Sequence, residues 1–211
     1  MKVYDWDEAV EHLKSNDARM AAIIERIGPS RMEIRHTHSI FYSLLRSIVY
    51  QQLAGKAAAA IFNRLNVAMT SSESADTHAT PEQILAASEE TLRAAGLSRN
   101  KMLAVKDLAA KTIDGTVPTL RMIHGMSDDE IIDRIVQVRG IGRWTVEMLL
   151  IFRLARPDVL PLDDLGVRKG IKVTYRMRAL PTKEQMVKKS AKWRPWRSVG
   201  SWYMWRASEL K

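Results

Sequence analysis

Apolar residues recur at three- and four-residue intervals through most of the chain, which is the spacing of amphipathic helices. The strongest pattern covers residues 38–66, where two apolar stretches are separated by a short polar turn with Gly55 near the break. This arrangement predicts two helices joined by a turn. Because no segment alternates cleanly between apolar and polar residues, and no Asn-Gly turn occurs, we expect no strands. The predicted fold class is all-α.

Capping and breaking residues place the other expected helices. Thr80-Pro81-Glu82 has a capping hydroxyl followed by proline in the first turn, and Ser127 precedes acidic residues that suit a helix N-terminus. Residues 68–80 are expected to form a loop and residues 122–126 a connection. Further helices are expected over residues 5–27 with a second piece from Asp17, from Ser88 to Gly96, over 99–114, and over 182–192.

The tripeptide Gly140-Ile141-Gly142 lies between two amphipathic segments, IIDRIVQV and RWTVEMLLIF, and predicts a helix–hairpin–helix unit over residues 131–152. Glycines permit positive φ and bring no Cβ into the turn. Backbone N–H groups at the start of the second helix can therefore reach a phosphate oxygen. Ile141 is expected to plug the hairpin between its helices. The structural alternative is a plain turn between two helices with glycine at the C-cap.

Composition narrows the partner and the chemistry. The net charge of +9 favours a polyanionic partner through phosphate neutralisation and counterion release. The absence of cysteine excludes disulfides, thiolate nucleophiles, Cys-ligated zinc and iron–sulfur clusters. No apolar run is long enough for a transmembrane helix, and the N-terminal region lacks the apolar core of a signal peptide. We therefore expect an intracellular protein that does not bind membranes.

Two adjacent carboxylates, Asp163 and Asp164, follow the second hairpin helix at the end of a short proline-containing loop. A carboxylate beside a sugar can stabilise the oxocarbenium-like charge that develops as a base leaves, and it can orient or deprotonate the attacking water. Both residues qualify on chemistry alone. The structural alternative is that both only cap the following helix.

Several separated motifs resemble the helix–hairpin–helix DNA glycosylases: SIVYQQLAGKAA, VRGIGRWTVEMLLIF, LPLDD, and WRPWRS followed by WYMW. The tryptophan-rich strings are similar to the branch that excises alkylated purines, the 3-methyladenine DNA glycosylase II type. The resemblance implies two helical lobes with an active-site cleft between them, within one domain over residues 1–211. A middle lobe of about residues 50–165 would contain the hairpin, and the N- and C-terminal helices would form the second lobe.

The same resemblance implies roles for individual residues near the reacting base. Asp164 directly precedes a helix with a basic residue and matches the catalytic aspartate, which leaves Asp163 as a cap or loop residue. The competing interpretation of aromatic residues at helical spacing is core packing. The residues expected to line the base pocket are Trp144, Trp205, Met148, Trp202 and Tyr203.

Other implied roles concern DNA and a cation. Gln52, or alternatively Leu53, would fill the gap left by the extruded nucleotide, unless the glutamines of this turn only satisfy its backbone groups. The backbone carbonyls of Val136, Val138 and Ile141 would hold a monovalent cation, Na⁺ or K⁺. The residues expected to contact DNA are Gly140, Ile141, Gly142, Arg143, Thr145, Gln52 and Leu53.

The resemblance implies a monofunctional glycosylase that removes alkylated purines of the 3-methyladenine and 7-methylguanine class from double-stranded DNA during base excision repair. Relatives that also cleave the strand use a lysine near the hairpin as a Schiff-base nucleophile, and this chain has Trp144 there. Two alternatives stay open: a non-catalytic DNA-binding protein, and a glycosylase for another damaged base. We expect a monomer in the cytoplasm, at a bacterial nucleoid, or in a nucleus, with no required cofactor.

Overall fold

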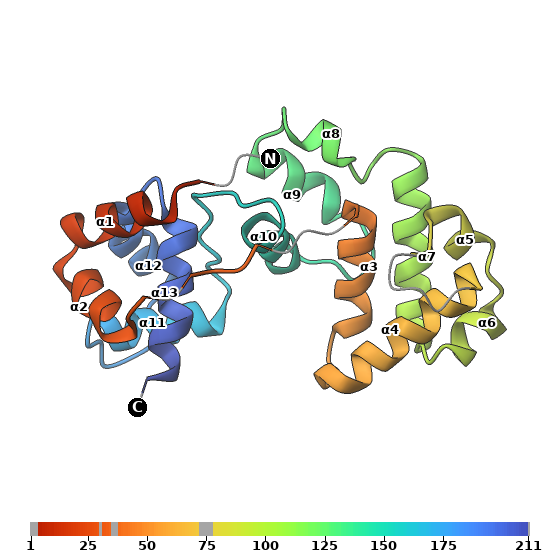
Figure 1. The fold of residues 1–211 in the computed structure, drawn as a ribbon, viewed down its shortest axis with the longest axis horizontal. Helices are drawn as coiled ribbons and strands as arrows, with labels where there is room; N and C mark the ends of the chain where they lie inside the picture. The colour runs from red at the N-terminus through yellow and green to blue at the C-terminus, as the bar shows by residue number, and fades with distance from the viewer. Residues whose placement is uncertain (1–3, 30, 35–37, 72–77, 211) are drawn as a thin grey trace. The chain divides into compact units, whose positions relative to one another are not determined.

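The computed structural model describes residues 4–29, 31–34, 38–71 and 78–210, and every regular element in those ranges is helical (Figure 1). The prediction of an all-α fold is confirmed. Within the same ranges, no helix combines the length and the apolar character needed to cross a membrane.

The chain forms two compact units. The terminal unit consists of Met1–Arg35 and Leu150–Lys211, and the central unit consists of His36–Leu149. The lobe boundaries expected from sequence were near residues 50 and 165. The units instead divide after Arg35 and after Leu149. The helix over 40–50 packs against other helices of the central unit, and the second division falls within the hairpin helix. The cleft expected between two lobes stays a prediction.

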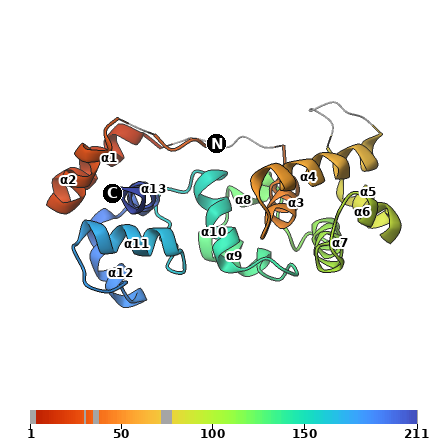
Figure 2. The same cartoon turned by 90° about the horizontal axis from the view of Figure 1, so that it is seen from below.

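The terminal unit is built around two helices that lie side by side, α11 (Leu165–Thr174) and α13 (Arg197–Glu209) (Figures 1 and 2). Their contact is close because Gly170 has no side chain: a Cβ there would lie 2.0 Å from the Met204 carbonyl oxygen. The other helices of this unit are α1 (Trp6–Asn16), α2 (Ala18–Ile27), α12 (Lys183–Ser190) and the short 3₁₀ helix η1 (Ala191–Trp193).

The break between α1 and α2 follows from a single residue. The carboxylate of Asp17 accepts hydrogen bonds from the backbone N–H groups of Arg19 and Met20, and so caps α2. At the other end, Gly28 has a φ of 78° and ends the helix. The predicted break at Asp17 and the predicted end at Gly28 are confirmed.

The central unit packs α3 (Ile40–Tyr50) against both α4 (Gly55–Thr70) and α7 (Arg99–Ile113). Aliphatic side chains of α3 and α7, such as Leu44, Ile48 and Leu108, are fully buried. The hairpin helix α10 (Arg143–Phe152) begins in this unit and ends in the terminal one. The other helices are α5 (Pro81–Ala86), α6 (Glu89–Ala94), α8 (Leu120–Ile123) and α9 (Asp128–Ile135).

Three sequence predictions of this unit need correction. The expected loop over 68–80 begins later, because α4 continues to Thr70; residues 72–77 lie outside the described residues. The expected connection over 122–126 starts inside α8, which is one turn long and too short to show an apolar period. The predicted cap at Ser127 is confirmed, but α9 begins at Asp128 rather than at Ile131, because Ser127 and Glu130 form a capping box.

Candidate functional site

The hairpin has the geometry expected for a phosphate-binding turn. Gly140 has a φ of 78°, a conformation that residues with a Cβ adopt at a cost. Ile141 is 4% exposed and its N–H donates to the Val138 carbonyl at 3.0 Å, so the prediction that it plugs the hairpin is confirmed. The exposed Gly142 opens the first turn of α10, since its carbonyl accepts from Thr145 and Val146. Helix N-terminal N–H groups have no partner within their own helix, and they bind anions.

Helix α7 holds the hairpin in place through a carboxylate and an ammonium group. Asp107 accepts a hydrogen bond from the Arg139 N–H at 2.7 Å and forms an ion pair with Lys111 at 2.8 Å. Lys111 also donates to the Gln137 carbonyl. Arg139 and Gln137 both lie in the hairpin turn, so α7 fixes the shape of this turn from outside the two hairpin helices. Sequence reasoning missed Asp107 and Lys111, because a polar residue on an ordinary helix gives no motif.

The turn between α3 and α4 is joined to the hairpin. Gln51 donates from Nε2 to the Gly140 carbonyl at 2.9 Å. Lys101 on α7 donates to the carbonyls of Val49 and Gln51 at 2.6 and 2.9 Å, and burial lowers the pKa of its ammonium group. The alternative from sequence, that the glutamines only satisfy backbone groups of their own turn, is wrong for Gln51, because its side chain donates to a backbone carbonyl of the hairpin.

The two candidate wedge residues lie at the tip of this anchored turn. Gln52 is exposed and has a φ of 58°, and Leu53 is 39% exposed. An L-residue at positive φ is strained by about 1 kcal/mol, and such strain often occurs at functional sites. Both side chains therefore project from a turn whose backbone is fixed by Lys101 and Gln51.

Helix α10 presents an exposed aromatic ring in its first turn. Trp144 is 48% exposed, and Met148, one turn later on the same face, is half-buried. Arg143 is held beside them by ion pairs with Glu147 at 3.1 Å and Asp129 at 3.4 Å. Trp144 is therefore not a core residue, which was the structural alternative for it.

Asp164 is buried and held by two donors. It is 7% exposed and caps α11, with Oδ1 accepting from the Val167 N–H and from the Trp205 indole N–H, each at 2.8 Å. Gly166 permits this approach, because a Cβ there would lie 2.7 Å from the Trp205 ring. Asp163 differs: its side chain is 58% exposed and pairs with Lys183. The two adjacent carboxylates thus differ in environment: Asp164 is buried, and Asp163 is exposed to solvent.

The aromatic residues of α13 fall into two groups. Trp205 is half-buried, contacts Asp164 and stacks on Phe152, with ring centroids 5.3 Å apart. Trp202 and Tyr203 are 6% and 2% exposed, and both pack against Trp6. Their burial in the core of the terminal unit corrects the expectation that they line a base pocket.

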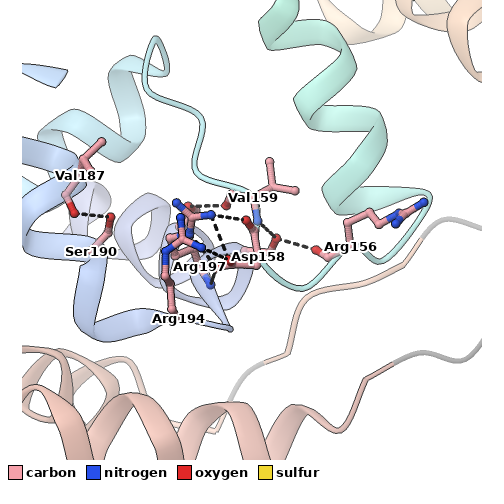
Figure 3. A network of polar contacts seen from close by, with 9 residues as sticks. Arg156, Asp158, Val159, Val187, Ser190, Arg194 and Arg197 are labelled. Carbon is pink, nitrogen blue, oxygen red and sulfur yellow. Dashed lines mark hydrogen bonds and ion pairs between the residues drawn. The ribbon is translucent and has the colours of Figure 1, made fainter. Parts of the chain in front are cut away.

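The WRPWRS motif anchors the loop that leads to Asp164 (Figure 3). Arg197 donates from Nε and Nη2 to the two carboxylate oxygens of Asp158, at 2.6 and 2.9 Å. Arg194 forms an ion pair with the same carboxylate at 3.1 Å. Ser198 donates to the Arg156 carbonyl and accepts from the Val159 N–H. The bidentate pair and the hydroxyl bridge join this loop to the N-terminus of α13. Sequence reasoning used the motif as a family marker and missed this function.

The cation site implied by the resemblance consists of the backbone carbonyls of Val136, Val138 and Ile141, and whether it binds a cation stays a prediction. The Val138 carbonyl already accepts the Ile141 N–H, and a carbonyl oxygen keeps a second lone pair. Among the residues that the structure describes, no group of three or more His, Cys, Asp or Glu side chains has an arrangement that could hold a metal ion.

Comparison with known proteins identifies the family. A model of the HhH-GPD superfamily of base excision DNA repair proteins matches residues 45–195. DNA-3-methyladenine glycosylase 1 of Schizosaccharomyces pombe is 39% identical over 203 residues, which are 94% of this chain and 86% of that protein. DNA-3-methyladenine glycosylase 2 of Escherichia coli is 26% identical over 60% of this chain and 41% of its own length.

Solved structures agree with this assignment. The S. pombe 3-methyladenine DNA glycosylase in complex with abasic DNA is 39% identical, with a TM-score of 0.79 over 96% of this chain and 97% of that one. A DNA-3-methyladenine glycosidase from Bacillus halodurans is 29% identical, with a TM-score of 0.85 over 100% of this chain and 94% of that one. The family model and the S. pombe relative each cover most of the sequence, and the chain therefore belongs to the HhH-GPD superfamily of base excision DNA repair proteins.

Proposed function

We propose that this protein is a monofunctional DNA glycosylase that hydrolyses the N-glycosidic bond of alkylated purines, of the 3-methyladenine and 7-methylguanine class, in double-stranded DNA. The relatives named above supply the substrate class. The observation that supports the chemistry is the buried carboxylate of Asp164, oriented by the α11 N-terminus and the Trp205 indole.

In the proposed reaction, the glycosidic bond breaks and its electron pair leaves with the base. The Asp164 carboxylate stabilises the positive charge that develops on the deoxyribose, and water adds to the sugar carbon and loses a proton. The products are the free base and an abasic site. Two donors on Oδ1 hold the carboxylate in one orientation, so little reorganisation is needed as charge develops.

The exposed ring of Trp144 is the proposed stacking surface for the extruded base, with Met148 beside it. Alkylation at these purine positions makes the base cationic, and an electron-rich indole attracts a cation over its face. Trp205 contributes to the proposed reaction mainly by orienting Asp164. Trp202 and Tyr203, which lie in the core, are not part of the proposed pocket.

The proposed DNA contacts come from the central unit. Backbone N–H groups at Gly142 and the first turn of α10 would bind a phosphate, with Arg143 and Thr145 beside them. Gln52, with Leu53 next to it, would fill the gap in the duplex, a role supported by their exposure on an anchored turn. A Na⁺ or K⁺ at the carbonyls of Val136, Val138 and Ile141 is part of the same proposal. We further propose that the protein acts as a monomer in the compartment that contains the chromosome.

A gel assay on matched duplexes tests the proposed function. With 7-methylguanine or 3-methyladenine in the duplex, we expect strand scission only after alkali treatment, because the enzyme would leave an intact abasic site. With a deaminated or oxidised base we expect much less scission. Strand-cleaving relatives have a nucleophilic lysine where this chain has Trp144, so we expect no strand cleavage by the enzyme itself. Scission without alkali, or an enzyme–DNA adduct trapped by borohydride, would contradict this monofunctional mechanism. Absence of scission with every alkylated duplex would overturn the proposal itself.

Replacing Trp205 with phenylalanine tests its orienting function. The variant keeps an aromatic ring beside Phe152 but loses the N–H that donates to Asp164. A hydrogen bond to a charged acceptor is worth about 1.5–3 kcal/mol, so we expect the single-turnover excision rate to fall about 10- to 100-fold. Binding of the damaged duplex should change little. A loss confined to binding, with the excision rate unchanged, would instead assign Trp205 to base stacking alone.

A further inference from the structure

The positive charge of the chain is concentrated in one segment. Residues 165–196 contain ten Lys and Arg residues and a single acidic residue, Glu184. This segment therefore accounts for the whole net charge of +9, and the rest of the chain contains equal numbers of acidic and basic residues. It comprises α11, the connection to α12, α12 itself and η1, all in the terminal unit. The hairpin, by contrast, belongs to the central unit.

Most of these cations have no acidic partner among the described residues, although Lys189 lies over the Tyr175 ring. Arg168 donates to the Pro181 carbonyl, Lys183 pairs with Asp163, and Arg194 pairs with Asp158. Lysines near the end of α12 also suit its helix dipole. Neither these contacts nor the helix dipole accounts for the exposed cations of the α11–α12 connection and of η1. The cations for which the described chain shows no acidic partner within 4 Å are Lys169, Lys172, Arg176, Arg178, Lys188, Lys189 and Lys192.

A hollow in this surface gathers several of these cations. The cavity measures about 450 Å³, and Lys188, Lys189 and Lys192 line it together with Asp17 and Tyr175. The carboxylate of Asp17 is engaged by the N–H groups at the start of α2 and by the Tyr175 hydroxyl. Burial and the Asp17 carboxylate raise the pKa of Tyr175, so its phenol stays neutral. Asp17 is the one acidic residue among those lining the hollow, so the three lysines leave it with a net positive charge.

We propose that this surface, formed by α12, η1 and the α11–α12 connection and here called the basic face, binds phosphates of duplex DNA as a contact separate from the hairpin. Clustered like charges repel one another, and a polyanion removes that cost while releasing counterions from DNA. The assignment to duplex DNA rather than to another polyanion rests on the proposed function. Lysine ammonium groups contact phosphates as point charges, and phosphate contacts carry no sequence information, so the contact is expected to be independent of sequence.

The salt dependence of binding to an undamaged duplex tests this proposal. In the double variant Lys188→Gln/Lys192→Gln, we expect the slope of log Kd against log salt concentration to fall by about 1.8, since each lost phosphate contact reduces it by about 0.9. The matched control is Arg93→Gln/Arg121→Gln, which removes two exposed cations from the central unit. We expect its slope to change by less than about half of that amount.

Two further measurements separate this proposal from the proposed function. Single-turnover excision at saturating enzyme should be unchanged in Lys188→Gln/Lys192→Gln, because neither residue belongs to the proposed catalytic site. Absence of excision by the wild-type protein would overturn the proposed function while leaving the salt-slope result interpretable. A slope unchanged from wild type would overturn the basic face as a DNA contact. So would a variant that loses affinity for phosphatidylserine vesicles but not for the duplex.

Discussion

Replacing Asp164 with asparagine is expected to abolish excision of alkylated purines while preserving the fold and DNA binding. Asparagine caps helices as well as aspartate does, so its side-chain oxygen can still accept from Val167 and Trp205. The variant loses the negative charge that would stabilise the transition state. Removing one such electrostatic group reduces rates by at least about 100-fold. Single-turnover kinetics on a duplex containing 7-methylguanine, with thermal unfolding in parallel, measures both expectations.

The adjacent residue provides the matched control. Asp163→Asn changes the same functional group one position earlier, on a side chain that is 58% exposed and paired with Lys183. An exposed ion pair contributes at most about 1 kcal/mol, so we expect excision and stability close to wild type. Wild-type turnover by Asp164→Asn would leave only the capping function for Asp164. Excision would then depend on a group other than this carboxylate, and the assignment of Asp164 as the catalytic residue would be wrong.

The features predicted correctly from sequence are those with a local cause. The start of α5 is set by Thr80 and Gln83, which lie three residues apart, and the break at Asp17 needs only the two N–H groups that follow it. The hairpin plug at Ile141 was predictable because the glycines on either side mark the turn. In each case the interacting groups lie within one helical turn, so the sequence contains both partners together.

The features that were missed depend on partners far apart in the chain. Gln51 reaches Gly140 across 89 positions, and Trp205 reaches Asp164 across 41. Spacing along one helix cannot predict such pairs. The same limit explains the errors on α13: this helix is buried on most sides, so no polar face indicates that Trp205 points to Asp164 while Trp202 points to the core. The neighbouring glycines Gly166 and Gly170 determine that contact, and their importance appears only when α11 lies against α13.

Replacing Gly170 with alanine is therefore expected to damage both stability and activity. The added Cβ would lie 2.0 Å from the Met204 carbonyl oxygen and 2.5 Å from its carbon, and both atoms are backbone. A helix cannot yield locally as a flexible side chain can, so α11 must move away from α13. Overpacking of this kind costs about 3 kcal/mol, and urea denaturation measures it as a lower transition midpoint.

The same displacement should weaken excision even in molecules that remain folded, because Asp164 is the N-cap of α11 and Trp205 belongs to α13. Moving one helix relative to the other lengthens the hydrogen bond that orients the carboxylate. The matched control is Gly125→Ala, where the nearest atom to an added Cβ is 4.0 Å away, and there we expect wild-type stability and excision. If Gly170→Ala kept the wild-type transition midpoint and the wild-type excision rate, the close packing of α11 on α13 would not be what holds Asp164 in position.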